Sequence, residues 1–165
     1  MGWLASRDST TSTGVPSYAI GDNMNLERAI EIAVSAHKGQ IDKGGNPYIL
    51  HPLSVMMALD SEDEKIVGVL HDVVEDNQAW TFERLEIEGF SVSVIEALKS
   101  VTKLSENEDY DDFITRCIGN DIGKKVKIAD IRHNLDVRRI DKIGDQDIDR
   151  LNRYKRAHAR ILNEL

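Results

Sequence analysis

From residue 25 onward, the apolar positions of this 165-residue chain recur at spacings of three and four. In the first such segment Leu26, Ile30 and Val34 share one face and the pattern ends at Gly39, which is typical of an amphipathic helix. No segment shows the sustained alternation of a half-buried strand. The sequence therefore predicts an all-α fold, a compact helical bundle with mostly short connections. Further helices are expected at residues 52–59, 60–76, 82–89, 91–101, 109–119, 122–140 and 146–162.

Residues 1–23 differ from the rest of the chain. The run Ser-Thr-Thr-Ser-Thr-Gly at residues 9–14 has no apolar period, so this segment is predicted to be a flexible tail. The remaining residues, 24–165, suit one domain with a core of its own.

Composition narrows the class of protein. A chain with 41% hydrophobic and 30% charged residues is ordinary for a soluble globular protein. A net charge of −8 argues against a nucleic-acid partner, which would require a basic stripe. No apolar run approaches the ~20 residues of a membrane span, so no membrane partner is expected. The single cysteine, Cys117, cannot form an internal disulfide, which favours a reducing, cytoplasmic location.

Histidines and carboxylates gather in four short segments. An adjacent His-Asp pair is common by chance, but here it lies between an earlier histidine and two further acidic residues, and a distant aspartate follows. A divalent-metal phosphohydrolase needs these groups in this order, so the sequence predicts an enzyme. The segments are Tyr48-Ile49-Leu50-His51-Pro52, Leu70-His71-Asp72-Val73-Val74-Glu75-Asp76, Lys127-Ile128-Ala129-Asp130 and His133-Asn134.

Helix geometry gives an independent test of the His71 segment. With His71 at 0° on a helical wheel, Glu75 falls near about 40°, Asp72 near 100° and Asp76 near 140°. Most apolar residues of the segment occupy the opposite arc. Gly68, at about 60° on the wheel, has no side chain and would therefore leave space for a ligand on the polar face. The alternative interpretation is a solvated acidic face.

Asp130 lies on a second polar stripe. Lys127 and Asn134 share this stripe, and apolar residues border it on both sides. That pattern predicts burial, and a buried charge needs a partner or a metal. The alternative is that Asp130 only forms an isolated salt bridge.

The remaining histidines have different expected roles. His51 is favoured as a metal ligand because Pro47 and Pro52 stiffen its surroundings. His37 lies on an apolar helix face and is expected to be a satisfied core histidine. His133 is expected to be packed or hydrogen-bonded near the site.

These groups predict a specific chemistry. Two imidazoles and two carboxylates suit Mn²⁺, Fe²⁺ or Zn²⁺, and four protein ligands leave positions free for water and a phosphate oxygen. Glu75 and Asp76, one turn further along, are expected to orient that water and move its proton. The predicted ligands are His51, His71, Asp72 and Asp130.

The motifs resemble the HD superfamily of metal-dependent phosphohydrolases. They are similar, more specifically, to the hydrolase domain of RelA/SpoT-type alarmone enzymes and their small single-domain relatives. The resemblance covers residues 24–140. Besides the segments above, it rests on Ala36-His37-Lys38-Gly39-Gln40 and on Pro47-Tyr48-Ile49-Leu50-His51-Pro52-Leu53.

The resemblance implies an all-α bundle and removal of pyrophosphate from the ribose 3′ position of guanosine tetra- or pentaphosphate. It implies metal ligation, usually of Mn²⁺, by His51, His71, Asp72 and Asp130. The catalytic acidic pair would be Glu75 and Asp76. The small-molecule nucleotide substrate would lie in a pocket lined by Lys43, Tyr48 and Asn134.

Three positions depart from the family pattern. Asp42 stands where a basic residue is usual before Lys43, and Asp136 and Val137 stand at usual basic and hydroxyl positions. These departures predict intact metal chemistry with altered substrate recognition. Two alternatives follow: the same chemistry on a nucleotide monophosphate or a phosphorylated dinucleotide cofactor, and a non-catalytic nucleotide sensor. The complete acidic pair argues against the sensor, because carboxylates near a polyanion would weaken pure binding.

Overall fold

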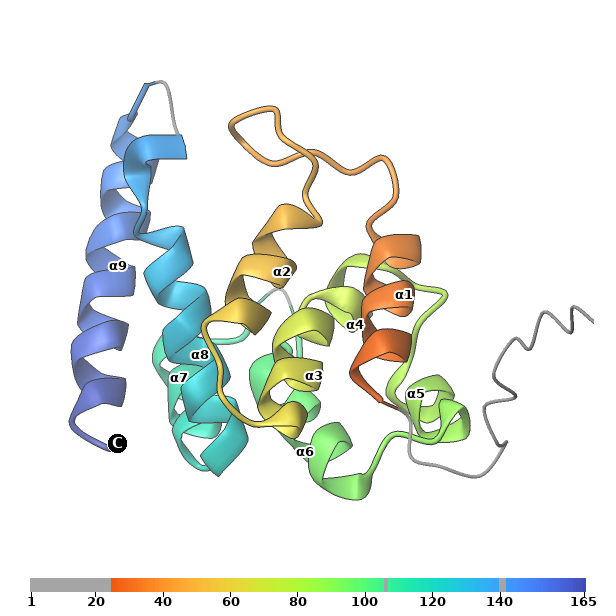
Figure 1. Cartoon of the computed structure of the whole chain (residues 1–165). Helices are drawn as coiled ribbons and strands as arrows, with labels where there is room; N and C mark the ends of the chain where they lie inside the picture. Colours follow the sequence, from red (N-terminus) through yellow and green to blue (C-terminus); the bar gives the residue numbers. More distant parts are fainter. Residues whose placement is uncertain (1–24, 106, 140–141) are drawn as a thin grey trace, which may run out of the picture.

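The computed structural model of the chain describes residues 25–105, 107–139 and 142–165 (Figure 1). The predicted tail, residues 1–23, lies outside these ranges. Within them the all-α prediction is confirmed, because no strand occurs and Ile41 and Pro47 form only an isolated bridge. None of the described helices is long and apolar enough to cross a membrane. The helices are α1 (Leu26–Ala36), α2 (Leu50–Met57), α3 (Glu62–Leu70), α4 (Val73–Asp76), α5 (Phe82–Glu88), α6 (Val92–Val101), α7 (Tyr110–Ile118), α8 (Asp121–Asn134), the 3-10 turn η1 (Val137–Arg139) and α9 (Asp145–Leu162).

Short polar side chains begin most of these helices by accepting hydrogen bonds from free backbone N–H groups. Ser61 forms a full capping box with Glu64 at the start of α3. A cap of this kind contributes about 1 kcal/mol. Gly89 ends α5 in the left-handed conformation (φ 103°), which glycine adopts without strain. Side-chain caps also come from Asn25, Thr81, Ser91, Asp109 and Asn120.

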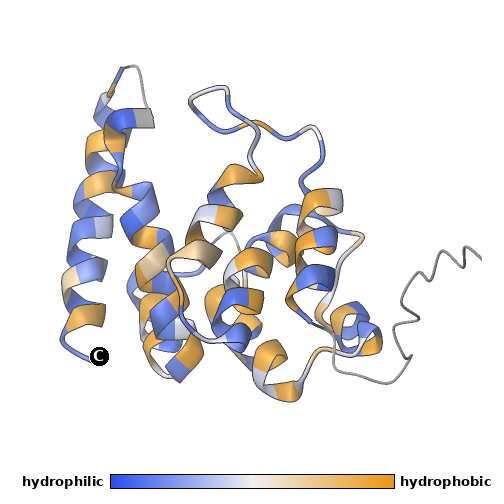
Figure 2. Ribbon diagram, in the orientation of Figure 1, coloured by the Kyte–Doolittle hydropathy of each residue, from blue (hydrophilic) through white to orange (hydrophobic). Residues whose placement is uncertain are grey.

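The bundle is organised around α3. This helix contacts α1, α2, α6 and α8, and α9 packs on the outer side of α8 (Figure 1). Apolar faces turn toward this centre (Figure 2), where Val67, Val69 and Leu70 are fully buried. The core is mainly aliphatic, as expected from a chain with 5% aromatic residues.

Two predicted helices are shorter than the sequence indicated. The segment 60–76 is interrupted between Leu70 and Val73. There the His71 side chain turns back so that Nδ1 lies 2.8 Å from the Gly68 carbonyl oxygen. The segment expected to run to residue 140 ends at Asn134, because Asp136 accepts from the backbone N–H of Arg138 and starts a new turn.

Gly68 has a packing role, so the interpretation that it leaves room for a ligand is wrong. It is buried against α2: a Cβ at this position would lie 2.6 Å from Leu59 Cδ1 and 3.3 Å from Met56 Cα. The missing side chain therefore lets α2 approach α3. Because α2 carries His51 and α3 leads to His71, this close approach decides how near the two imidazoles lie.

Gly68→Ala should destabilise the protein by about 1–3 kcal/mol, the usual cost of overpacking a dense core. Urea unfolding would measure the change. Gly119→Ala is the matched control, because its Cβ would meet no atom closer than 3.5 Å and its φ of −66° suits any residue. Equal stability of the two variants would show that α2 and α3 can separate at no cost.

Candidate metal centre

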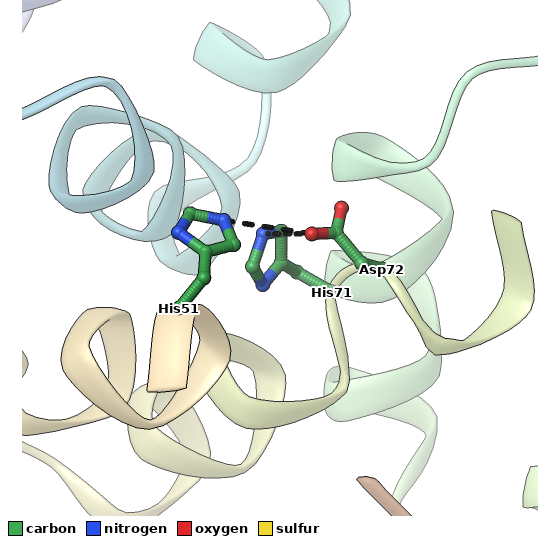
Figure 3. A group of neighbouring side chains, drawn as sticks. All are labelled: His51, His71 and Asp72. Atoms are coloured by element: carbon green, nitrogen blue, oxygen red, sulfur yellow. Dashed lines mark ion pairs between the residues drawn. The ribbon is translucent and has the colours of Figure 1, made fainter. Parts of the chain in front are cut away.

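Two helices and one interruption between helices bring the predicted ligands together. His51 lies in the first turn of α2, Asp130 on α8, and His71 and Asp72 in the break between α3 and α4. A ring nitrogen of His51, one of His71 and a carboxylate oxygen of Asp72 all lie within 4.8 Å of one another (Figure 3). Such a group can share one metal ion.

Asp130, on α8, lies beside the two imidazoles. Its Oδ1 lies 3.2 Å from Nε2 of His51 and 3.8 Å from Nε2 of His71. Asp72 Oδ2 lies 3.5 Å and 3.0 Å from the same two nitrogens. Both carboxylates thus face both Nε2 atoms, which is the mixed nitrogen and oxygen donor set that suits a divalent transition metal.

Hydrogen bonds outside the cluster fix the orientation of these groups. His71 Nδ1 is held by the Gly68 carbonyl, as described above. His51 Nδ1 lies 2.8 Å from His133 Nδ1, which confirms the hydrogen-bonded position expected for His133. Such outer partners fix ring orientation and leave Nε2 toward a metal.

The carboxylates are held in the same way. Lys127 Nζ donates to Asp130 Oδ2 at 2.8 Å and Asn134 Nδ2 donates to Oδ1 at 2.6 Å. The Tyr48 hydroxyl donates to Asp72 Oδ2 at 2.5 Å. Burial and the nearby Asp72 carboxylate raise the pKa of Tyr48 above its usual value, so this hydroxyl stays a donor.

The residues present fit a bound cation. His71 Nε2 is buried and makes no hydrogen bond with any described residue, although Asp72 Oδ2 lies only 3.0 Å away. An unsatisfied buried polar atom costs about 1–3 kcal/mol. A cation between the imidazoles and carboxylates would satisfy this nitrogen.

The electrostatics favour cation binding. Burial acts to raise the pKa of Asp72 and Asp130, but the neighbouring histidines, and Lys127 beside Asp130, outweigh it and lower both pKa values. Burial lowers the pKa of His51, and its hydrogen bonds to the two carboxylates reverse this effect and raise it to about 9. Two ionised carboxylates in a mostly buried cluster therefore attract positive charge, from protons or from a metal.

A cleft of about 350 Å³ opens onto the cluster. It is bounded by His51, Asp72 and Asp130, and by the three residues that the family resemblance assigned to the nucleotide pocket. Basic side chains line part of this cleft although the chain as a whole has a net charge of −8, so the local field can differ in sign from the mean. The cationic lining residues are Lys43, Lys103, Lys127, Arg150 and Arg153.

The two acidic residues of α4 diverge. Glu75 lines the cleft, and its Oε2 accepts from the backbone N–H of Lys103 at 3.3 Å. Asp76 is not among the described residues that line the cleft. It turns toward the end of α1, where its Oδ2 accepts from Gln40 Nε2 at 3.0 Å.

Several lining residues were missed by sequence reasoning. Arg150, Arg153 and Tyr154 come from α9, beyond residue 140, and Tyr110 begins α7. The spacing of three and four on α9 was the available signal, because it places the three side chains on one helix face. Lys103 offered no comparable signal, since it lies in a loop.

The three departures from the family pattern lie differently. Asp42 lines the cleft, and its Oδ1 accepts from the backbone N–H groups of Gly44 and Asn46, both at 2.9 Å. It therefore closes a turn as well as carrying charge. Asp136 and Val137 are not among the described lining residues.

Proteins of known name are similar to this chain over half to three quarters of its length. The chain is 33% identical over 125 residues to a bifunctional (p)ppGpp synthase/hydrolase, SpoT, of Escherichia coli, covering 67% of this chain and 17% of that protein. The chain is a homologue of the RelA/SpoT proteins. No family model matches it.

Two further RelA/SpoT-type relatives support this assignment. A GTP pyrophosphokinase of Myxococcus xanthus is 31% identical over 138 residues, or 73% of this chain and 18% of that protein. A putative chloroplastic GTP diphosphokinase of rice is 39% identical over 95 residues, or 54% of this chain and 10% of that protein. The chain thus spans less than a fifth of each of these RelA/SpoT relatives.

Divalent cations should stabilise the wild-type protein, because a ligand that binds only the folded state at 100 times its Kd adds about 2.7 kcal/mol. His71→Ala and Asp130→Ala should abolish this gain and lower metal content in elemental analysis. The control is His158→Ala, on the outer helix α9. Unchanged metal content in both cluster variants would contradict the assignment.

Proposed function

We propose that this chain is a metal-dependent phosphohydrolase that removes pyrophosphate from the ribose 3′ position of guanosine tetra- or pentaphosphate. The proposal takes residues 24–165 as one HD-type hydrolase domain and Mn²⁺ as its preferred metal. One observation carries it: a largely buried cluster of two imidazoles and two carboxylates lies at the base of a cleft with a basic wall. The hydrolase named among the homologues acts on this substrate class.

The proposed ligands are His51, His71, Asp72 and Asp130. A divalent cation held there would polarise a phosphoryl oxygen and acidify bound water. Glu75 is the one acidic side chain of α4 that lines the cleft, so we assign it the role of general base toward the attacking water. Asp76, on the same short helix, completes the acidic pair.

We assign substrate binding to the cationic residues that line the cleft, called here the basic wall: Lys43, Lys103, Lys127, Arg150 and Arg153. Two buried polar atoms of lining residues, the Tyr110 hydroxyl and Arg150 Nε, have no hydrogen-bond partner among the described residues. Both suit phosphate oxygens, as do Lys103 and Arg153 nearby. Tyr48 and Asn134 are neutral and donate hydrogen bonds to the carboxylates of Asp72 and Asp130. They therefore form part of the base of the cleft, and the cationic side chains of the basic wall bind the phosphates.

A second candidate is the same hydrolysis on a phosphorylated dinucleotide cofactor or a nucleotide monophosphate. Asp42 favours it, because a carboxylate in the wall repels one arm of a nucleotide that carries two diphosphates. Purified protein tested on a panel of these nucleotides, with and without Mn²⁺, separates the candidates. Binding without turnover of any of them would indicate the sensor instead.

Glu75→Gln should retain metal and lose about 10²–10⁴-fold in kcat, the usual contribution of a general acid–base group. Turnover and elemental analysis would be measured together. Glu83→Gln, on the exposed surface of α5, should behave like wild type. Near-normal turnover of the Glu75 variant would remove this residue from the reaction.

Two substitutions at Asp42 separate the effect of its charge from the effect of the two hydrogen bonds that it accepts in the turn. Asp42→Asn keeps an acceptor oxygen for Gly44 and Asn46 and removes the charge, so KM for a polyanionic nucleotide should fall a few-fold at unchanged kcat. Asp42→Ala also loses both turn hydrogen bonds, and its KM should rise because the loop that carries Lys43 loosens. A raised KM in Asp42→Asn would show that the carboxylate itself recognises substrate and would favour the second candidate.

A further inference from the structure

His37 is a buried histidine outside the metal cluster. Its side chain is fully buried at the end of α1, where the sequence favoured a satisfied core histidine. Only Nδ1 is satisfied, by Gln40 Oε1 at 2.8 Å. Nε2 is buried without a hydrogen-bond partner among the described residues. The burial expected of a core histidine is therefore confirmed, but only one of the two ring nitrogens is hydrogen-bonded.

Gln40 connects this histidine to the acidic pair. Its Nε2 donates to Asp76 Oδ2 at 3.0 Å while its Oε1 faces His37. His37 Nδ1 itself lies 3.9 Å from the same carboxylate oxygen. A parallel contact, from Asn77 Nδ2 to the Ala36 carbonyl oxygen at 3.0 Å, ties the same ends of α1 and α4 together.

Hydrogen-bonding chemistry determines the direction of each bond. An ionised carboxylate only accepts, so the amide NH₂ of Gln40 must face Asp76. The amide oxygen is then left for His37, which must donate from Nδ1. In the neutral ring Nε2 is consequently an acceptor without a proton. His37 lines a second hollow together with Val34, Lys38 and Ile41, and its Nε2 forms no hydrogen bond there with any described residue.

We propose that Gln40, oriented by His37, is a positioning residue for the Asp76 carboxylate. This inference rests on the proposed hydrolase function. The helix that carries Asp76 has only four residues and no side-chain cap, so its own backbone holds the carboxylate weakly. Gln40 anchors Oδ2, and Oδ1, which has no hydrogen-bond partner among the described residues, stays available for a proton. Gln40 also lines the cleft, so the anchor lies beside the substrate.

The position of His37 explains why a histidine is needed there. Its ring lies 5.0 Å from the Tyr48 ring, and Tyr48 holds Asp72 by the hydrogen bond described above. The buried His37 ring therefore contacts Tyr48, which holds the candidate metal ligand Asp72. The same ring orients Gln40, which holds Asp76, the candidate proton carrier. Metal content must be followed in every variant, because a change at His37 can act through Tyr48.

The test compares Gln40→Leu with Gln78→Leu, an exposed glutamine two residues after Asp76. Gln40→Leu should lower kcat roughly 10–100-fold, less than the loss of an acid–base group itself, with metal content and KM unchanged. His37→Asn, whose amide nitrogen can occupy the place of Nδ1, should stay near wild type, whereas His37→Ala should match Gln40→Leu. In an Asp76→Asn background, Gln40→Leu should cost nothing further, because coupled residues are not additive.

An undiminished cost of Gln40→Leu in the Asp76→Asn background, or loss of metal in Gln40→Leu, would overturn the proposal. NMR spectra of the full chain with diamagnetic Zn²⁺ supply a readout that needs no substrate. The side-chain amide signals of Gln40 should shift in Asp76→Asn and not in Gln78→Leu, and His37 should carry its proton on Nδ1. A proton on Nε2 would also refute the proposed bridge. A wild-type protein that hydrolyses no nucleotide would refute the proposed function, while the spectra would still decide the bridge.

Discussion

Burial of the Asp130 carboxylate is the constraint on which the rest of the site depends. Asp130 is 6% exposed, and an ionised carboxylate removed from water must find charged or hydrogen-bonding partners. Lys127 and Asn134 come from its own helix, but His51 comes from α2 and His71 from the end of α3. The helices must therefore approach closely around α8, and a glycine on α3 makes that approach possible.

This enclosure gives the molecule two charge environments that its net charge conceals. Carboxylates concentrate at the base of the cleft, where a cation is favoured. Lys103, Arg150 and Arg153 stand on its walls, where anions are favoured. Fields that are focused in a cleft act on a ligand more strongly than the mean charge of the protein does. A chain of net charge −8 can thus present a local site for a polyanion.

The regular helices serve as a scaffold, and the irregular segments aim the side chains. His71 and Asp72 lie where the helical segment is interrupted. Asp42 closes a turn at the rim of the cleft. Gln40 comes directly after the turn that follows α1. In a continuous helix through residues 60–76, the side chains would have kept the positions on the helical wheel that the sequence predicted. The interruption instead sets the direction of α4, on which the neighbouring residues Glu75 and Asp76 face the cleft and α1, respectively.

The sequence by itself determined the helical class, most helix starts and the four segments whose histidines and carboxylates the structure brings together. Periodicity and capping are local, because each involves residues within a turn or two. Only the tertiary structure decided that Gly68 packs against α2, that α9 supplies Arg150 and Tyr154 to the cleft, and that Gln40 reaches Asp76. These contacts join residues that are distant in the chain, and the energy of burying one face against another depends on both partners. A pattern in one segment therefore cannot specify them.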